Sequence, residues 1–256
     1  MTVFDAYAQY YDLLYQDKDY AKEANFIHKL IATYAPQAQD VLELGSGTGR
    51  HAEYLAEQGY CLTGVERSPE MLARCAQRQT IQTQSIQNRP TFLEGDLRKI
   101  RLDRQFDCVL SLFHVISYQA TNADLSAAFN TVAQHLKPGG VFIFDVWYGP
   151  AVLRDLPQVR VKRLQNDSLA ITRIAEPVLH PNENWVDVNY HIFLQPTGQN
   201  FCHELQEVHR MRYLFKPELE DLLSRSALTL EQYGEWMSDQ PADFDTWGVY
   251  FVAVKS

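Results

Sequence analysis

The sequence predicts an α/β fold, a doubly wound and mostly parallel seven-stranded sheet with an antiparallel β insertion after strand five. Three observations carry this prediction. Short apolar runs alternate with helix-like segments through residue 147, a Gly-rich turn follows the first run, and a two-residue polarity period begins after residue 150. Because parallel neighbouring strands need crossover helices, the alternation places helices on both faces of the sheet.

The core elements follow from periodicity and capping. Residues 18–34 carry apolar side chains at helical spacing and end before Pro36, which predicts a helix. Ser68 and Pro69 predict a capped start for a helix over 68–79. The remaining helices are expected at 50–58, 122–136 and 216–228. The core strands are expected at 39–44, 61–66, 91–96, 106–113, 141–147, 229–236 and 247–254.

An insertion interrupts this core. Residues 169–178, 185–195 and 204–215 are rich in β-branched and aromatic residues, alternate in polarity and are separated by turn-like segments. We therefore divide the chain into an N-terminal core at 1–150, an antiparallel insertion at 151–215 and a C-terminal part of the core at 216–256. Ligands of such sheets bind at the carboxyl ends of the strands, so the insertion is expected to cover that end as a lid.

Composition restricts the function. The chain has 256 residues, of which 46% are hydrophobic and 21% charged, and a net charge of −9, which disfavours a nucleic-acid partner. Apolar runs stay well below the roughly 20 residues of a membrane span, and the N-terminus does not resemble a signal peptide, so we expect a cytoplasmic protein without a membrane partner. The four cysteines are scattered, and no metal site is predicted.

The glycine-rich turn at residues 45–49 is suited to a ligand. Its glycines let a ligand approach the backbone closely, and the helix that begins at Arg50 presents backbone N–H donors. Arg50 stands where a dinucleotide fingerprint needs glycine, and the Lys-Ser or Lys-Thr pair of a P-loop is missing. Glu66 ends the next predicted strand, where a carboxylate can accept both hydroxyls of a ribose. These features indicate a nucleoside ligand, although a glycine turn can also serve packing alone.

With the acidic Glu43 two residues before the loop, the sequence resembles the class I S-adenosyl-L-methionine (SAM)-dependent methyltransferases, which have a Rossmann-like methyltransferase fold. The resemblance implies that the loop receives the methionine part of SAM, Glu66 the ribose and Asp96 the adenine amine, with Met71 against the adenine ring. S-adenosyl-L-homocysteine (SAH) is the expected product. The residues expected to bind the cofactor are Tyr7, Glu43, Gly45, Ser46, Gly47, Arg50, Glu66, Arg67, Met71, Gly95, Asp96, Leu97, Leu112 and Phe113.

Two further stretches concern the methyl acceptor. The segments QYYDLLYQDKDY at 9–20 and LFHVISYQ at 112–119 resemble the bacterial N,N-dimethyltransferases of nucleotide-linked amino sugars. The resemblance implies an active-site role for Tyr11. Tyr118 stands where those enzymes have a histidine, and His114 lies four residues earlier. We predict Tyr11, His114 and Tyr118 as catalytic residues and a small-molecule acceptor, favouring an amine of a nucleotide-activated sugar because an amine needs only to be neutral to react.

Other interpretations remain open. An O-methyltransferase of a small metabolite would need a general base or a metal, a protein or RNA methyltransferase would need an extended groove, and a non-catalytic SAM-binding module would need no acceptor. The N-terminal tyrosines could simply pack on the sheet. Arg210 and Arg212 share one face of a strand, where solvent exposure is the default and a substrate phosphate the alternative. The histidines other than His114 show no convincing nucleophile or ligand arrangement, and these are His28, His51, His135, His180, His191, His203 and His209. The insertion could pair two copies in a homodimer.

Overall fold

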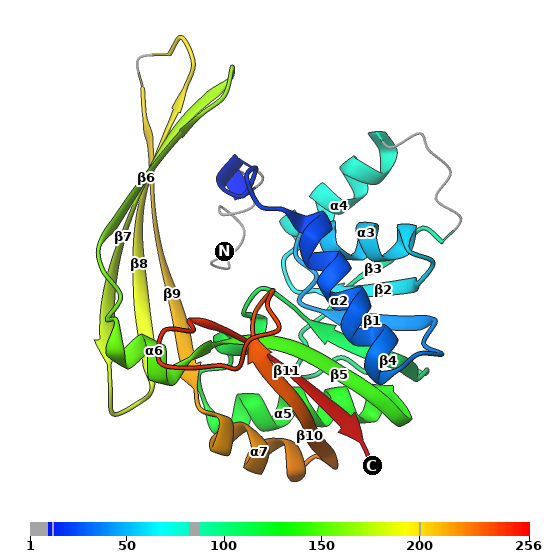
Figure 1. Cartoon of the computed structure of the whole chain (residues 1–256). Coiled ribbons are helices and arrows are strands. Elements are labelled where there is room, and N and C mark those ends of the chain that lie inside the picture. Colours follow the sequence, from blue (N-terminus) through cyan, green and yellow to red (C-terminus); the bar gives the residue numbers. More distant parts are fainter. Residues whose placement is uncertain (1–9, 12, 82–87, 200) are drawn as a thin grey trace.

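The computed structural model describes residues 10–11, 13–81, 88–199 and 201–256. Figure 1 shows an α/β core from which a long, curved antiparallel sheet extends beyond one end. In the part of the chain that is described, no helix is both long and apolar enough to cross a membrane.

The core sheet has the predicted seven strands in the order β3-β2-β1-β4-β5-β11-β10. Its strands are β1 (Asp40–Leu44), β2 (Cys61–Glu66), β3 (Thr91–Glu94), β4 (Phe106–Ser111), β5 (Leu136–Tyr148), β10 (Leu228–Glu235) and β11 (Gly248–Lys255). The first five are parallel, and β11 runs antiparallel to both β5 and β10. The predicted fold class is therefore confirmed.

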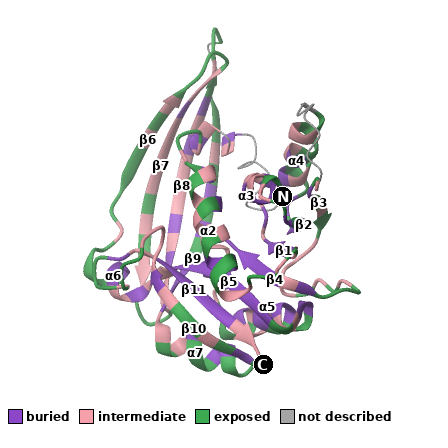
Figure 2. Ribbon diagram, turned by 45° about the vertical axis from the view of Figure 1, so that its right-hand side comes forward, coloured by how far each residue is buried: buried purple, intermediate pink, exposed green. Residues whose placement is uncertain are grey.

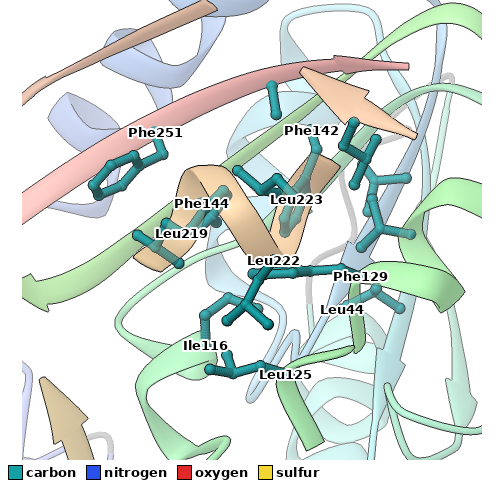
Figure 3. Close-up of a cluster of buried hydrophobic side chains, with 14 of the residues drawn as sticks. Leu44, Ile116, Leu125, Phe129, Phe142, Phe144, Leu219, Leu222, Leu223 and Phe251 are labelled. Carbon is teal, nitrogen blue, oxygen red and sulfur yellow. The ribbon is translucent and has the colours of Figure 1, made fainter. Parts of the chain in front are cut away.

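Helices cover both faces of this sheet, as the alternation predicted. The helices are α2 (Tyr20–Tyr34), α3 (Arg50–Glu57), α4 (Pro69–Ile81), α5 (Asn122–His135), α6 (Gly149–Arg154), α7 (Lys216–Ser224) and the 3-10 helix η1 (Val115–Tyr118). Residues of α2 and α3 share a buried cluster with Val141 and Ile143 of β5, whereas α5 and α7 pack on Phe142 and Phe144 (Figure 3). The period of two along β5 thus sends successive side chains to opposite faces.

The insertion forms four antiparallel strands, namely β6 (Arg160–Gln165), β7 (Leu169–His180), β8 (Trp185–Pro196) and β9 (His203–Leu214). Trp147 and Tyr148 at the end of β5 pair in parallel with Tyr213 and Leu214 of β9. The insertion therefore continues the core sheet beyond the carboxyl end of β5, which is the end where ligands of this fold class bind.

The short helices α6 and η1 were not predicted, and two strands also differ from the expectation. Strand β6 was not predicted, because it is a largely exposed edge strand whose charged residues hide the alternation (Figure 2). Strand β5 begins directly after α5 at Leu136, not at 141, because a register shift between Phe106 and Cys108 of β4 accommodates the residues around Gly139, where φ is +75°.

Candidate active site

A cavity of about 310 Å³ lies at the carboxyl ends of the parallel strands. Of the predicted site residues, Tyr7 lies outside the described residues, and all the others line this cavity. On the side expected to bind the cofactor these are Glu43, Gly45, Ser46, Gly47, Arg50, Glu66, Arg67, Met71, Gly95, Asp96, Leu97, Leu112 and Phe113. On the side expected to bind the acceptor they are Tyr11, His114 and Tyr118. Residues distant in the sequence therefore meet around one space.

The glycine loop between β1 and α3 has two kinds of glycine. Gly45, Gly47 and Gly49 all have positive φ, at +77°, +55° and +75°, which other L-residues adopt only with strain. A Cβ atom on Gly45 would lie 2.5 Å from Cγ1 of Val115 in η1, so Gly45 permits the loop to pack against that helix. A Cβ atom on Gly47 would have no neighbour within 4 Å among the described residues, because Gly47 faces the cavity.

Glu66 at the end of β2 is tied to the same loop. Its Oε2 accepts a hydrogen bond from the backbone N–H of Gly47 at 2.8 Å, and its Oε1 accepts those of Arg67 and Ser68, each at 2.8 Å. Burial raises the pKa of Glu66, and these backbone hydrogen bonds act in the opposite direction. Three donors leave lone-pair capacity on a carboxylate, so a ribose hydroxyl can still be accepted there.

Glu43 is the most deeply buried acid of the cavity, with 1% of its surface exposed. Its Oε1 lies 3.8 Å from Nδ1 of His51, whose Nε2 lies 2.7 Å from Oε2 of Glu23. Its Oε2 is buried and has no hydrogen-bond partner in the part of the chain that the structure describes. Burial, reinforced by the charge of Glu66, raises the pKa of Glu43 to about 8. This carboxyl group suits a cationic ligand, and the ammonium and sulfonium groups of SAM fit it.

We expect binding of SAM to weaken on acidification in a way that depends on Glu43. With a pKa near 8, the carboxyl is neutral below that pH, and a cation binds the ionised form more tightly. The affinity should therefore fall as the pH drops below about 8, by up to about tenfold per pH unit. Isothermal titration calorimetry with SAM at several pH values measures this slope.

The variant Glu43→Gln supplies the control, because it cannot ionise and should show a flatter profile. The stability of the ligand-free protein should depend on pH in the opposite direction to the affinity for SAM. Between the ordinary value of 4.5 and about 8, the folded protein holds a proton at Glu43 that the unfolded chain has released. The unfolding free energy of the ligand-free protein thus falls as pH rises through this window. Equal pH slopes for the two proteins would contradict the assignment.

The far end of the cofactor side is formed by Asp96 and Met71. Asp96 accepts hydrogen bonds from Nε of Arg98 at 2.9 Å and from its backbone N–H at 2.9 Å, which lower its pKa. Arg98 also contacts Asp124 at 2.7 Å, so Asp96 is held in place and stays charged. Met71 of α4 is buried, lines the cavity and belongs to the same buried cluster as Ile192 of the insertion.

The acceptor side begins with a strained turn after β4. Phe113 and His114 both have positive φ, at 63° and 62°, an arrangement that costs energy in residues other than glycine. The turn is held by the buried carboxylate of Asp145, which lies 3.1 Å and 3.2 Å from the backbone nitrogen of His114. The Nδ1 atom of His114 also lies 2.7 Å from Oδ2 of Asp145. This carboxylate therefore fixes the position of the imidazole at the cavity.

The N-terminal aromatic residues cover the same turn. The rings of Tyr11 and Tyr15 are 4.8 Å apart, and Tyr15 meets Phe113 edge-on at 5.1 Å. The hydroxyls of Tyr11 and Tyr20 are hydrogen-bonded to each other. Lys162 of β6 donates to the backbone carbonyl of Leu14 at 2.6 Å, which joins this segment to the insertion. These tyrosines therefore pack against neighbouring side chains and also line the cavity.

The insertion contributes a wall of its own. Tyr190 of β8 and His209 and Met211 of β9 line the cavity, a position that the sequence did not predict for any of them. Arg212 is buried and not solvated, because it bonds to Glu218, Asn122 and the backbone of Ala120. Arg210 is exposed and pairs with Asp187. Neither arginine lines the cavity.

Sequence reasoning did not single out several lining residues from the core, and these are Tyr15, Tyr20, Thr48, His51, Arg98, Val115 and Gln119. Trp147, whose place at the end of the fifth strand made it a possible lining residue of an acceptor pocket, also lines the cavity. Most of them lie within a few residues of a recognised motif, so extending each motif by one helical turn would have found them. Tyr190, His209 and Met211 carry no local signal, because strand pairing alone brings them to the cavity.

The geometry agrees with comparisons to known proteins. Residues 41–140 match the family described as Methyltransferase domain. A dTDP-3-amino-3,4,6-trideoxy-alpha-D-glucopyranose N,N-dimethyltransferase of Streptomyces venezuelae is 30% identical over 227 residues, covering 88% of this chain and 91% of the relative. A dTDP-3-amino-3,6-dideoxy-alpha-D-glucopyranose N,N-dimethyltransferase of Streptomyces fradiae is 28% identical, covering 88% and 84%.

Solved structures agree as well. The crystal structure of DesVI from Streptomyces venezuelae has a TM-score of 0.79 at 28% identity and covers 98% of both chains. A SAM-dependent methyltransferase from Clostridium acetobutylicum has a TM-score of 0.81 at 23% identity, covers 96% of both chains, and shows the shared fold.

The fold and the site define a SAM-dependent methyltransferase. Within that class, the chain belongs to the family that includes the amino-sugar N,N-dimethyltransferases of Streptomyces.

Proposed function

We propose that this enzyme transfers the methyl group of SAM to the amine of a nucleotide-linked amino sugar. The observation that carries this proposal is the continuity of the cavity. The residues expected to hold SAM and the polar residues Tyr118 and His114 line the same space, which the insertion and the N-terminal tyrosines cover. The named activities of the Streptomyces relatives support the choice of an amino sugar.

The role of each residue follows from its position in the cavity. When bound, SAM supplies an electrophilic methyl group on a positively charged sulfur. Gly47 lets a ligand approach the backbone, Glu66 accepts from a ribose, and Glu43 balances positive charge. Tyr118 and His114 face the acceptor, and the covering segments exclude water and hold the amine in line with the methyl group.

A panel of acceptors tests this function. The purified enzyme is incubated with SAM and with dTDP-linked 3-amino and 4-amino sugars, and mass spectrometry follows both SAH and the sugar nucleotide. We expect SAH to accumulate only with an amino sugar, together with a product heavier by one or two methyl groups on nitrogen. Methylation of the corresponding hydroxyl sugar alone would replace this proposal by O-methyl transfer. SAH release with no panel member would reject the amino-sugar class.

Replacing Tyr11 by phenylalanine tests the acceptor side. The variant removes the hydroxyl that bonds to Tyr20 but keeps the ring against Tyr15. We expect turnover to fall about tenfold, as for the loss of one hydrogen bond, while SAM affinity changes little. Steady-state kinetics and calorimetry separate the two effects. Tyr54→Phe on α3, which lies outside the cavity lining, should behave like the wild type, and a Tyr11→Phe enzyme with full turnover would remove Tyr11 from the acceptor site.

A further inference from the structure

A chain of buried polar groups leads from the acceptor side of the cavity into the insertion. The Tyr118 hydroxyl lies 2.8 Å from Nδ1 of His209, and Nε2 of His209 lies 3.2 Å from Oε2 of Glu207. The same oxygen accepts a hydrogen bond from the hydroxyl of Tyr10 at 2.8 Å. His209 and Glu207 are 3% and 6% exposed. The groups come from η1, β9 and the N-terminal segment, so the tertiary fold assembles them.

The contacts fix the state of the imidazole. A carboxylate only accepts hydrogen bonds, so Glu207 selects the tautomer in which Nε2 of His209 carries the hydrogen. Nδ1 then has a free lone pair that accepts the hydroxyl hydrogen of Tyr118. The His209 ring is also held edge-on by the rings of Tyr118 at 5.8 Å and Tyr190 at 5.0 Å. The donor and acceptor directions along the chain are therefore consistent from Tyr118 to Glu207.

We propose, on the basis of the amino-sugar function proposed above, that Tyr118, His209 and Glu207 form a relay that removes a proton from the acceptor amine. The N–H bond of the ammonium breaks and its proton passes to the Tyr118 oxygen, while the hydroxyl proton of Tyr118 passes to Nδ1 of His209. Glu207 balances the resulting imidazolium. The freed lone pair then forms the N–C bond as the S–C bond of SAM breaks, and that electron pair stays on the sulfur of SAH.

The surroundings explain why a relay is needed. Burial raises the pKa of Tyr118 well above its usual value, so Tyr118 keeps its proton and cannot act as a standing phenolate. Passing one proton on while taking another avoids a buried negative charge. Among the described residues, the titratable or charged groups around Tyr118 and His209 are Glu207 of β9, Tyr190 of β8, Arg173 of β7, and Tyr10, Tyr11 and Tyr15 of the N-terminal segment. Among these, the Glu207 carboxylate is the group positioned to stabilise a charged His209.

In this relay Tyr118 is the catalytic residue that contacts the acceptor, and His209 and Glu207 act through it as positioning residues. The alternative base is His114, which is held by Asp145 on a different wall of the cavity. The two assignments differ in a measurable way, because only the relay makes turnover depend on residues of strand β9.

The kinetic test compares His209→Gln and Glu207→Gln with the wild type, using a dTDP-linked amino sugar as acceptor. Below the pKa of the acceptor ammonium, we expect kcat to fall about 100-fold in His209→Gln, with SAM affinity unchanged. Above that pKa the amine arrives neutral, so most of the loss should disappear. Glu207→Gln keeps the shape of the side chain but removes its charge, and should give a smaller loss with the same pH dependence.

The exposed His203 on the same strand provides the matched control, and His203→Gln should retain wild-type turnover at every pH. A loss in His209→Gln that is equal at all pH values would indicate a structural role and overturn the relay. Full activity in His209→Gln would overturn it as well. Thermal unfolding of each variant shows whether the fold is intact, and Glu207→Gln remains informative if His209→Gln fails to fold.

A second measurement does not depend on the acceptor. In protein with ¹⁵N-labelled histidine and bound SAH, the His209 resonances, assigned by their loss in His209→Gln, should report hydrogen on Nε2 and none on Nδ1. The opposite tautomer would reverse the direction of the hydrogen bonds between Tyr118, His209 and Glu207 and exclude the relay. If the wild type methylates no amino sugar, the function proposed above fails, and this tautomer alone decides whether the relay exists.

Discussion

Replacing Gly47 by leucine is expected to abolish binding of SAM and SAH while leaving the fold intact. A side chain at this position meets no atom of the described residues within 4 Å of its Cβ and enters the cavity, where the methionine part of the cofactor is expected. We expect the affinity for SAH to fall at least about 100-fold, or roughly 2.7 kcal/mol, because the space is filled. Isothermal titration calorimetry measures the loss.

A matched control separates the filling of the cavity from backbone strain. Leucine at Gly47 has to adopt a φ of +55°, which costs about 1 kcal/mol of stability. Gly139 has a φ of +75°, likewise has no atom of a described residue within 4 Å of its Cβ position, and lies outside the cavity. Gly139→Leu should therefore lose similar stability and keep its affinity. A Gly47→Leu protein that binds SAH like the wild type would show that the cofactor lies elsewhere.

The second large effect is expected for Glu66→Ala. This change removes the predicted acceptor of the ribose hydroxyls and the three hydrogen bonds that join Gly47, Arg67 and Ser68 to the end of β2. We expect SAM to bind about 1–3 kcal/mol more weakly, the range for hydrogen bonds to a charged group. Because the loop also loses its anchor, the upper end of that range is the more consistent value.

Glu94 is the natural control for Glu66, because it pairs with Glu66 in register and ends the neighbouring strand β3. It is exposed and lies outside the cavity lining. Glu94→Ala should leave SAM affinity unchanged. Equal affinities in Glu66→Ala and the wild type would refute the role assigned to Glu66.

A feature could be predicted from the sequence when residues adjacent in the sequence are enough to identify it. The glycine loop, Glu66 and Asp96 each lie at or just beyond the end of a core strand, and the fold class alone places the ends of parallel strands at one edge of the sheet. The predicted residues of this kind line one cavity. The charged edge strand β6 escaped prediction because its side chains face solvent and lack a buried stripe.

Long-range pairing accounts for what the sequence did not reveal. His209 and Tyr190 reach the cavity because β9 joins the end of β5, and no short motif encodes that junction. Arg212 shares the two-residue period of Arg210, yet it is buried because β9 enters the core at this point and Glu218 of α7 lies beside it. Periodicity assigns a side chain to one face of a strand, and the neighbouring elements decide whether that face is solvated.

The central claim is that one cavity holds the cofactor over the end of β1 and directs its methyl group toward the acceptor side, where Tyr118 lies. The crystal structure of the SAH complex tests it most directly. We expect the ribose on Glu66, the adenine against Met71, and the sulfur beside the glycine loop, facing Tyr118 across the cavity. Density for the nucleoside at any other place, or with its sulfur turned away from Tyr118, would contradict the account.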